Sequence, residues 1–79
     1  MLYRKGDFMN LRQVQPGREY TIRQINTHDD ELNSFLFSLG CYSGEPITVI
    51  SHLWNGCVVS IKDGRYSIDT PLAQAILVH

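Results

Sequence analysis

The sequence predicts a small, mainly β domain of the α+β kind, with five short strands and one short amphipathic helix between the first and second strands. Three observations indicate this class. The chain has 79 residues, enough for one domain with a small core. Short runs of alternating or β-branched residues recur along it, separated by turns that contain Gly, Pro or Asn. One segment alone repeats its apolar residues at helical spacing.

The first elements lead from a helical turn into a strand. Leu11 and Val14 lie three residues apart, ahead of the turn pair Pro16-Gly17. This spacing predicts a short helical turn that places two side chains in the core. In residues 18–25 (REYTIRQI), apolar and polar side chains alternate, so the segment is predicted to be a strand with one apolar face.

The amphipathic helix follows a polar loop. Residues 32–39 carry Leu and Phe at positions i, i+3, i+4 and i+7, a stripe that we expect to seal the helix onto the rest of the domain. Thr27 and Asp30 have the spacing of a capping box, which predicts the start of the helix. Gly40 is the expected left-handed residue at its end.

Three strands joined by tight turns come next. They are predicted at residues 47–53 (ITVISHL), 57–62 (CVVSIK) and 65–69 (RYSID). The dipeptides Asn55-Gly56 and Asp63-Gly64 favour the positive φ angles of type I′ hairpin turns. The sequence therefore predicts a three-stranded meander.

The last strand closes the predicted architecture. Thr70-Pro71 is typical of an N-cap followed by proline at the first helical position, which predicts one short turn over residues 70–74. Residues 75–78 (AILV) form the final predicted strand. Five short strands in so small a domain can remove their unpaired edges by curling into a barrel. We therefore predict a five-stranded SH3-like barrel.

Composition and charge disfavour several classes of function. The net charge is −1 and the basic residues are scattered, which disfavours binding to nucleic acid. The apolar runs are much shorter than a membrane span, so no direct membrane insertion is expected. No signal peptide is visible and the sequence has two cysteines, which indicates a reduced, cytoplasmic location. A Cys41–Cys57 disulfide is a minor alternative.

The residues that could carry chemistry lack the spacing that it requires. Candidate metal ligands are His28, Cys41, His52 and Cys57, with His79 and the acidic run Asp29–Glu31 as further candidates. None falls in a C-x-x-C pair, an H-x-x-x-H pair or an EF-hand loop. Direct binding of Fe(II) or Zn(II) stays open, because imidazole and thiolate suit both metals.

The same residues do not form a recognisable catalytic motif. Sequence alone places no base beside a cysteine or serine, and the glycines fall at turns rather than in a phosphate-binding loop. We therefore expect no enzymatic activity. Cys41, directly after the expected helix end, is interpreted as a small apolar residue rather than a reactive thiol.

Two aromatic residues in loop or turn positions are candidates for contacts with a partner. Tyr42 and Trp54 lie where a large ring is hard to bury locally, and exposed aromatics often anchor protein interfaces. Trp54 has an alternative role, in which it folds over an open barrel end. A general SH3-like module that recognises a peptide through aromatics is a further possibility for the whole domain.

The order of these motifs is more specific than any one of them. They run Met9-x-Leu11-x-x-Val14-x-Pro16-Gly17, then Ile22 and Ile25, then Leu32-x-x-x-Leu36-x-x-Leu39-Gly40-Cys41-x-x-Gly44-x-x-Ile47-x-Val49. A hairpin and an alanine-containing closing segment follow. Over residues 9–78, this arrangement resembles the FeoA family of ferrous iron transport proteins.

The resemblance implies an SH3-like barrel that acts in the cytosol on FeoB, the membrane transporter with a GTPase domain that imports Fe(II). Met9 then marks the usual start of the family, so residues 1–8 are predicted to be an N-terminal extension to a domain at 9–79. The same module occurs at the C-terminus of iron-dependent repressors. No helix-turn-helix region precedes it here, which favours the stand-alone accessory role.

Two positions depart from the family pattern. Cys41 stands where Leu or Met is usual, and the hairpin turn His52–Cys57 is shorter and lacks the prolines of the family. The hypothesis is a non-enzymatic adaptor that binds FeoB and modulates iron uptake, with homo-oligomerisation also open. The residues expected to contact the partner are Leu39, Gly40, Tyr42, Ser43, Trp54 and Asn55.

Overall fold

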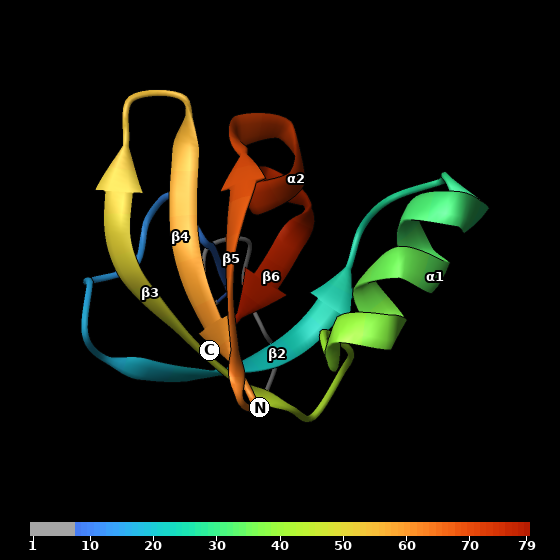
Figure 1. The fold of residues 1–79 in the computed structure, drawn as a ribbon, viewed down its shortest axis with the longest axis horizontal. Coiled ribbons are helices and arrows are strands. Elements are labelled where there is room, and N and C mark those ends of the chain that lie inside the picture. Colours follow the sequence, from blue (N-terminus) through green and yellow to red (C-terminus); the bar gives the residue numbers. More distant parts are fainter. Residues whose placement is uncertain (1–7) are drawn as a thin grey trace.

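The computed structural model describes residues 8–79, which form six strands and two helices. In chain order the elements are β1 (Met9–Asn10), β2 (Glu19–Ile25), α1 (Asp30–Leu39), β3 (Pro46–Leu53), β4 (Gly56–Ile61), β5 (Gly64–Asp69), α2 (Thr70–Ala75) and β6 (Ile76–Val78). All strand pairs are antiparallel, in the order β1-β6-β2-β3-β4-β5. The sheet curls around one core, and α1 stands to one side of it (Figure 1).

The mainly β class is confirmed, but the prediction of a closed, five-stranded barrel is wrong in two respects. β1 is a sixth strand of two residues that pairs with β6, and it is too short to show any periodicity in the sequence. Within residues 8–79 the edge strands β1 and β5 do not pair with each other. Instead α2 contacts both of them, and Leu11 N donates to Ala73 O of α2 at 3.1 Å.

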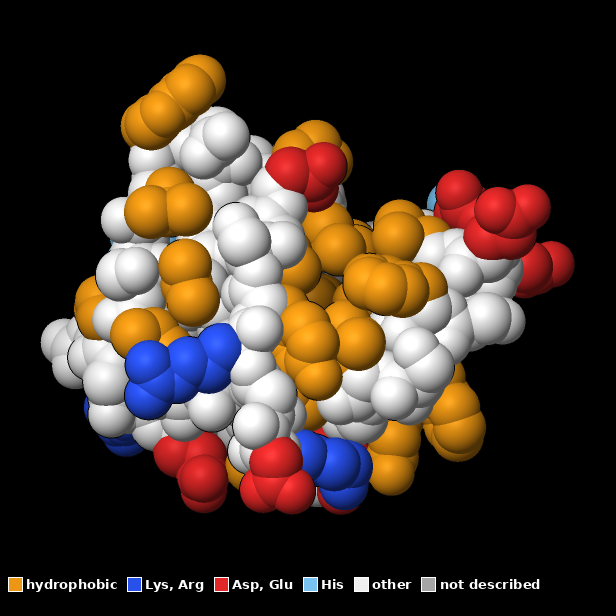
Figure 2. All heavy atoms as spheres, in the orientation of Figure 1, with side chains coloured by type: hydrophobic (Ala, Val, Ile, Leu, Met, Phe, Trp, Pro, Cys, Tyr) orange, Lys and Arg blue, Asp and Glu red, His pale blue; other side chains and the backbone are white. Residues whose placement is uncertain are grey.

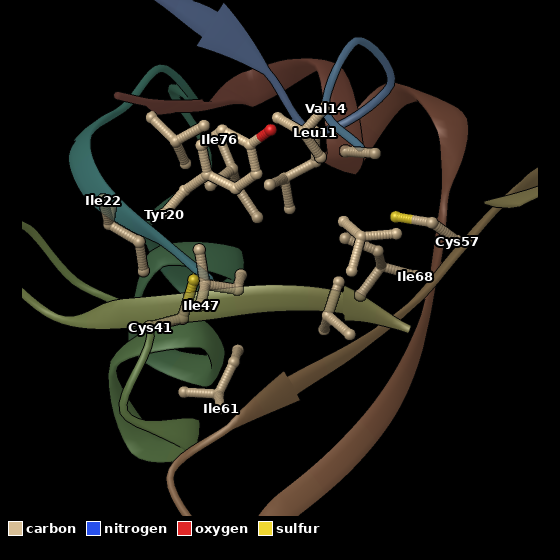
Figure 3. Packing of buried hydrophobic residues seen from close by; sticks show 14 of the residues in the cluster. Leu11, Val14, Tyr20, Ile22, Cys41, Ile47, Cys57, Ile61, Ile68 and Ile76 are labelled. Atoms are coloured by element: carbon tan, nitrogen blue, oxygen red, sulfur yellow. The ribbon is translucent and has the colours of Figure 1, made fainter. Parts of the chain in front are cut away.

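The core is built entirely from apolar side chains. It includes residues of β2, β3, β4, β5 and β6. Residues of the loop between β1 and β2 also belong to it (Figure 3). Leu11 and Val14 of that loop are 0% and 4% exposed, which confirms that they contribute to the core. Among residues 8–79 no polar or charged side chain is buried. The hydrophobic effect therefore holds the sheet around this core.

Both hairpins of the meander have two-residue loops, each one residue earlier than the predicted turn dipeptide. The loops are Trp54-Asn55 and Lys62-Asp63, because the strands pair as far as Leu53–Gly56 and Ile61–Gly64. Of the four loop residues only Lys62 has a positive φ, 52°. The prediction of type I′ turns is therefore wrong.

Gly56 is needed for a different reason, which is close packing between strands. A Cβ at this position would lie 1.9 Å from Ile68 O on the neighbouring strand β5. Only glycine lets the two backbones approach this closely.

The start of α1 also differs from the prediction. The N-cap is Asp29, whose Oδ1 accepts hydrogen bonds from Glu31 N at 3.0 Å and Leu32 N at 3.2 Å. Thr27 serves the preceding loop instead, since its Oγ1 accepts from Asp29 N. The prediction of a capping box that begins at Thr27 is therefore wrong. Gly40 ends the helix with a φ of 91°, as predicted.

The cap of α2 is likewise one residue away from the predicted position. Asp69 is the N-cap, and its Oδ1 accepts from Leu72 N at 3.0 Å. Thr70 N instead donates to Asn55 O at 2.9 Å, which continues the pairing between β4 and β5 by one residue. The prediction that Thr70 is the N-cap is therefore wrong by one residue.

Candidate functional site

The surface of residues 8–79 is hollowed between α1, α2 and β5, in a groove of about 540 Å³ that we call the α1–β5 groove. Figure 2 shows hydrophobic side chains gathered in this hollow. Its lining comes from the loop after β2, from α1, from β5 and from α2: Asn26, Thr27, His28, Leu32, Phe35, Ser67, Ile68, Asp69, Pro71, Leu72 and Ala75. Its size lies in the range of pockets that bind ligands or partner side chains.

The groove exists because α1 buries only part of its apolar stripe. Leu36 is 1% exposed and enters the core, whereas Phe35 is 52% exposed and lies in the groove beside Leu32. The expectation that the whole stripe seals the helix onto the barrel is therefore wrong for Phe35. Apolar side chains gathered in a concave surface make the groove a candidate binding site.

Charge is distributed unevenly around the groove. Its lining includes no Lys or Arg, and Asp69 is its one acidic residue. Asp29, Asp30 and Glu31 are exposed at the start of α1, directly after the lining residue His28. Acidic side chains accordingly flank the hydrophobic hollow on two sides (Figure 2). This arrangement favours an apolar ligand that also carries positive charge.

One group of predicted contact residues lies in the loop after α1, outside the groove. Tyr42 is half-buried, because its ring stacks on Phe37 with the centroids 4.7 Å apart. Lys62 Nζ lies 5.7 Å from the Tyr42 ring centroid and forms an ion pair with Glu45. The exposed ammonium group of Lys62 has its pKa raised by the hydrogen bond to Glu45. Tyr42 is thus held in a small packed cluster.

The other residues of this loop are also tied to their neighbours. Gly40 is buried, and a Cβ there would lie 2.6 Å from the Lys62 side chain. Ser43 is exposed, and its hydroxyl donates to Arg23 O at 3.0 Å. Leu39 is half-buried at the end of α1.

Trp54 and Asn55 lie at the tip of the β3–β4 hairpin, at the opposite end of the molecule from the Tyr42 loop (Figure 1). Trp54 is 91% exposed, so the alternative in which it folds over a barrel end is wrong. Arg12 braces the hairpin tip by donating to Leu53 O at 2.8 Å and to Gly56 O. The structure therefore separates the two groups of predicted contact residues, and neither lines the groove.

The two cysteines are free and lie on opposite sides of the core (Figure 3). Cys41 is 2% exposed, and burial raises the pKa of its thiol to about 11. Burial also raises the pKa of Cys57, with Arg12 acting in the opposite direction. Since metal ligands and nucleophiles are thiolates, both side chains are poorly suited to either task. The interpretation of Cys41 as a small apolar core residue is confirmed.

The histidine candidates are also dispersed. His28 lines the α1–β5 groove. His52 is opposite Cys57 in the β3–β4 register, and its Nε2 lies 2.8 Å from Val14 O. Because a carbonyl only accepts, Nε2 is the donor, and Nδ1 is buried without a partner among residues 8–79. No three His, Cys, Asp or Glu residues in this part of the chain gather where they could hold a metal ion.

Residues 9–79 match the FeoA domain family. The chain belongs to the FeoA family. The resemblance inferred from the motif order is thereby confirmed, and it connects this FeoA protein with ferrous iron transport. No curated protein matches the chain.

Three solved structures have similar folds. A crystal structure described as an iron uptake regulatory protein, FeoA, has a TM-score of 0.78 at 24% identity, over 90% of this chain and 95% of the other. A manganese-dependent transcriptional repressor has a TM-score of 0.77 at 22% identity, over 91% of this chain and 41% of the repressor. IdeR of T. acidophilum has a TM-score of 0.80 at 22% identity, over 98% and 36%. The chain thus spans less than half of either of the last two proteins, and these identities show the fold alone.

The groove is not predicted from the sequence, although several of its lining residues have other predicted roles. Leu32 and Phe35 belong to the apolar stripe of the helix, and His28 is a candidate metal ligand. One signal was available: Phe35, Leu36 and Phe37 are consecutive, and three consecutive helix residues cannot all face one core. Within residues 8–79 of this FeoA protein, no helix is long and apolar enough to cross a membrane.

Proposed function

We propose that this FeoA protein is a non-enzymatic, cytoplasmic adaptor that binds the cytosolic side of a FeoB-type transporter and modulates ferrous iron uptake. Family membership supports the link to iron transport. The observation that carries the binding role is the α1–β5 groove, where Phe35 is 52% exposed in an apolar hollow. Aromatic side chains in such positions are typical anchors of protein interfaces.

Direct binding of Fe(II) or Zn(II) has less support. It would need thiolates or imidazoles that converge, whereas Cys41 and Cys57 are buried with raised pKa values and on opposite sides of the core. A catalytic role has no better basis, because within residues 8–79 no hydrogen bond joins either thiol to a base: His52, which lies opposite Cys57, bonds to Val14 O instead. The adaptor role requires no converging ligands, only the exposed apolar surface that the domain has.

The test is titration of the purified cytosolic domain of a FeoB-type transporter into the wild-type protein and its variants, by calorimetry. We expect Phe35→Ala to weaken binding by roughly tenfold or more, because the removed ring is a large apolar contact. Phe37→Ala is the matched control: it removes the same side chain from the same helix, at 65% exposure outside the groove. It should change the affinity by less than about threefold.

Tyr42→Ala and Trp54→Ala complete the map of the surface. Loss of binding in Tyr42→Ala and Phe37→Ala, with Phe35→Ala unchanged, would move the contact to the loop after α1. Loss in Trp54→Ala alone would move it to the hairpin tip. Absence of binding by the folded wild-type protein would end the adaptor proposal.

A further inference from the structure

The exposed edge of β5 suggests how the groove binds its partner. β5 pairs with β4 alone, and within residues 8–79 no strand covers its other edge. The pairing with β4 runs from Gly64 to Asp69 without a register shift, whereas β2 and β3 both contain one. Natural proteins protect such an edge with a bulge, a proline, charged side chains or a covering helix. β5 has no bulge and no proline from Gly64 to Asp69. Its charged residues stand near its two ends, at Arg65 and Asp69, and α2 contacts it.

The β4–β5 register shows which backbone groups are available at this edge. Thr70 N donates to Asn55 O, so Thr70 points its amide toward β4. In an antiparallel pair, successive residues alternate between facing the partner strand and facing away. Tyr66 and Ile68 therefore direct their N–H and C=O groups toward β4. Arg65 and Ser67 direct theirs toward the uncovered edge.

This edge forms one wall of the α1–β5 groove. Ser67, Ile68 and Asp69 line it although they are consecutive. Successive side chains of a strand point to opposite faces, so a hollow that both Ser67 and Ile68 line is expected to border the edge of the strand. Asp69 ends β5 and caps α2, which continues this wall. Leu32 and Phe35 of α1 form the opposite wall. A hollow between an edge strand and a helix is the setting in which PDZ and PTB domains bind peptides.

We propose that the α1–β5 groove binds an extended peptide segment of a partner protein as an additional strand on β5. The peptide backbone would pair with the N–H and C=O groups of Arg65 and Ser67. The identity of the partner depends on the proposed function, whereas the binding mode is inferred from the free edge of β5.

The walls define the sequence that such a segment needs. Leu32, Phe35 and Leu72 line the groove, so the segment should carry apolar side chains at alternate positions. Asp69 lies at the end of β5, with Asp30 and Glu31 exposed at the nearby start of α1, whereas Arg65 lies at the beginning of β5. A Lys or Arg near the Asp69 end complements this charge. The ligand is therefore an apolar, basic, extended peptide.

The decisive variant is Ser67→Pro, with Ser67→Ala as its matched control. Proline removes the amide hydrogen that faces the open edge, and it leaves the hydrogen bonds with β4 in place because Ser67 does not use its amide there. Alanine removes the same hydroxyl but keeps the amide. Far-UV circular dichroism checks that both variants are folded.

The probe is a library of random nine-residue peptides displayed on phage and selected on the full wild-type chain. We expect selected peptides with alternating apolar residues and a Lys or Arg, which bind Ser67→Pro about tenfold more weakly than wild type or Ser67→Ala. N-methylation of a selected peptide at successive positions should weaken binding at every second residue. That readout leaves the protein unchanged, so it decides the matter even if Ser67→Pro does not fold.

The outcomes separate this inference from the proposed function. Equal binding of the peptides to wild type and Ser67→Pro, no period of two in the N-methylation series, or no selected peptide would overturn strand addition. A wild-type dimer that Ser67→Pro converts to a monomer in light scattering would assign the edge to a second copy instead. If the FeoB domain binds Ser67→Pro as well as wild type, the adaptor role stands and strand addition is wrong. If peptides bind at the edge but the FeoB domain does not bind wild type, the adaptor role is wrong and strand addition is retained.

Discussion

The core of the curled sheet and α1 use similar apolar residues to different effect. Ile22 and Val59, on strands of the sheet, are 0% exposed and surrounded by other apolar side chains. In α1, Leu36 is the one buried residue, while Phe35 and Phe37 are 52% and 65% exposed. Apolar area stabilises a fold only where it leaves water, so the sheet and its core provide most of the stability, whereas α1 provides accessible apolar surface. The contrast explains why the candidate site lies beside the helix.

The sharpest test of this contrast compares Ile22→Ala with Phe35→Ala in denaturant unfolding. Ile22→Ala removes three carbons from a closed core and should lower the free energy of unfolding by about 2–5 kcal/mol. Phe35→Ala removes a larger side chain, yet it should cost less than about 1.5 kcal/mol because the ring is already half in water. A larger loss for Phe35→Ala would mean that α1 belongs to the core after all.

A second prediction uses the pKa of Cys41, which lies where the end of α1 meets the core. Its thiol has a pKa of about 11, raised by burial from 9.0. The folded state therefore holds this proton more tightly than the unfolded state does. The resulting stability is fully present below pH 9 and is lost as the pH rises from about 9 to 11, by up to about 2 kcal/mol.

The measurement is the difference in unfolding free energy between wild type and Cys41→Ala across this pH range. Ionisation of the tyrosines and lysines affects both proteins alike and cancels. We expect the advantage of wild type to be constant up to pH 9 and to shrink above it. A constant difference up to pH 11 would show that the thiol is open to water and that the end of α1 is not sealed.

The same contrast separates what the sequence could predict from what it could not. The strands after residue 18 and the end of α1 at Gly40 were predicted within one residue, because alternation and helix termination are local patterns. The open edge of β5 depends on whether it meets β1, a contact between distant parts of the chain. No local pattern reports such a contact.

The groove was unpredictable for a related reason. The stripe of Leu32 to Leu39 shows that one face of the helix is apolar, but not how far the sheet reaches over that face. Trp54 and Tyr42 are predicted contact residues because a large ring in a loop is hard to bury locally. Trp54 is exposed as expected, at 91%. Tyr42 is less exposed than expected, because its ring stacks on Phe37. Whether either contacts a partner stays a prediction.

The smallest expected effect concerns the N-cap of α1, which distinguishes its observed start from the predicted one. Asp29→Ala removes the carboxylate that accepts from Glu31 N and Leu32 N, and it should lower the free energy of unfolding by about 1 kcal/mol. Thr27→Ala is the control. It removes one loop hydrogen bond to Asp29 N and should cost less, since no amide of the first helical turn depends on it.

Chemical denaturation of both variants gives the comparison directly. A greater loss for Thr27→Ala would restore the capping box read from the sequence. A loss of several kcal/mol for Asp29→Ala would show that the start of the helix is coupled to the core as tightly as Ile22 is. A loss of about 1 kcal/mol is the size expected for a helix end whose amides can turn to water instead. Such a helix can adjust against a bound peptide while the sheet beneath it keeps its shape.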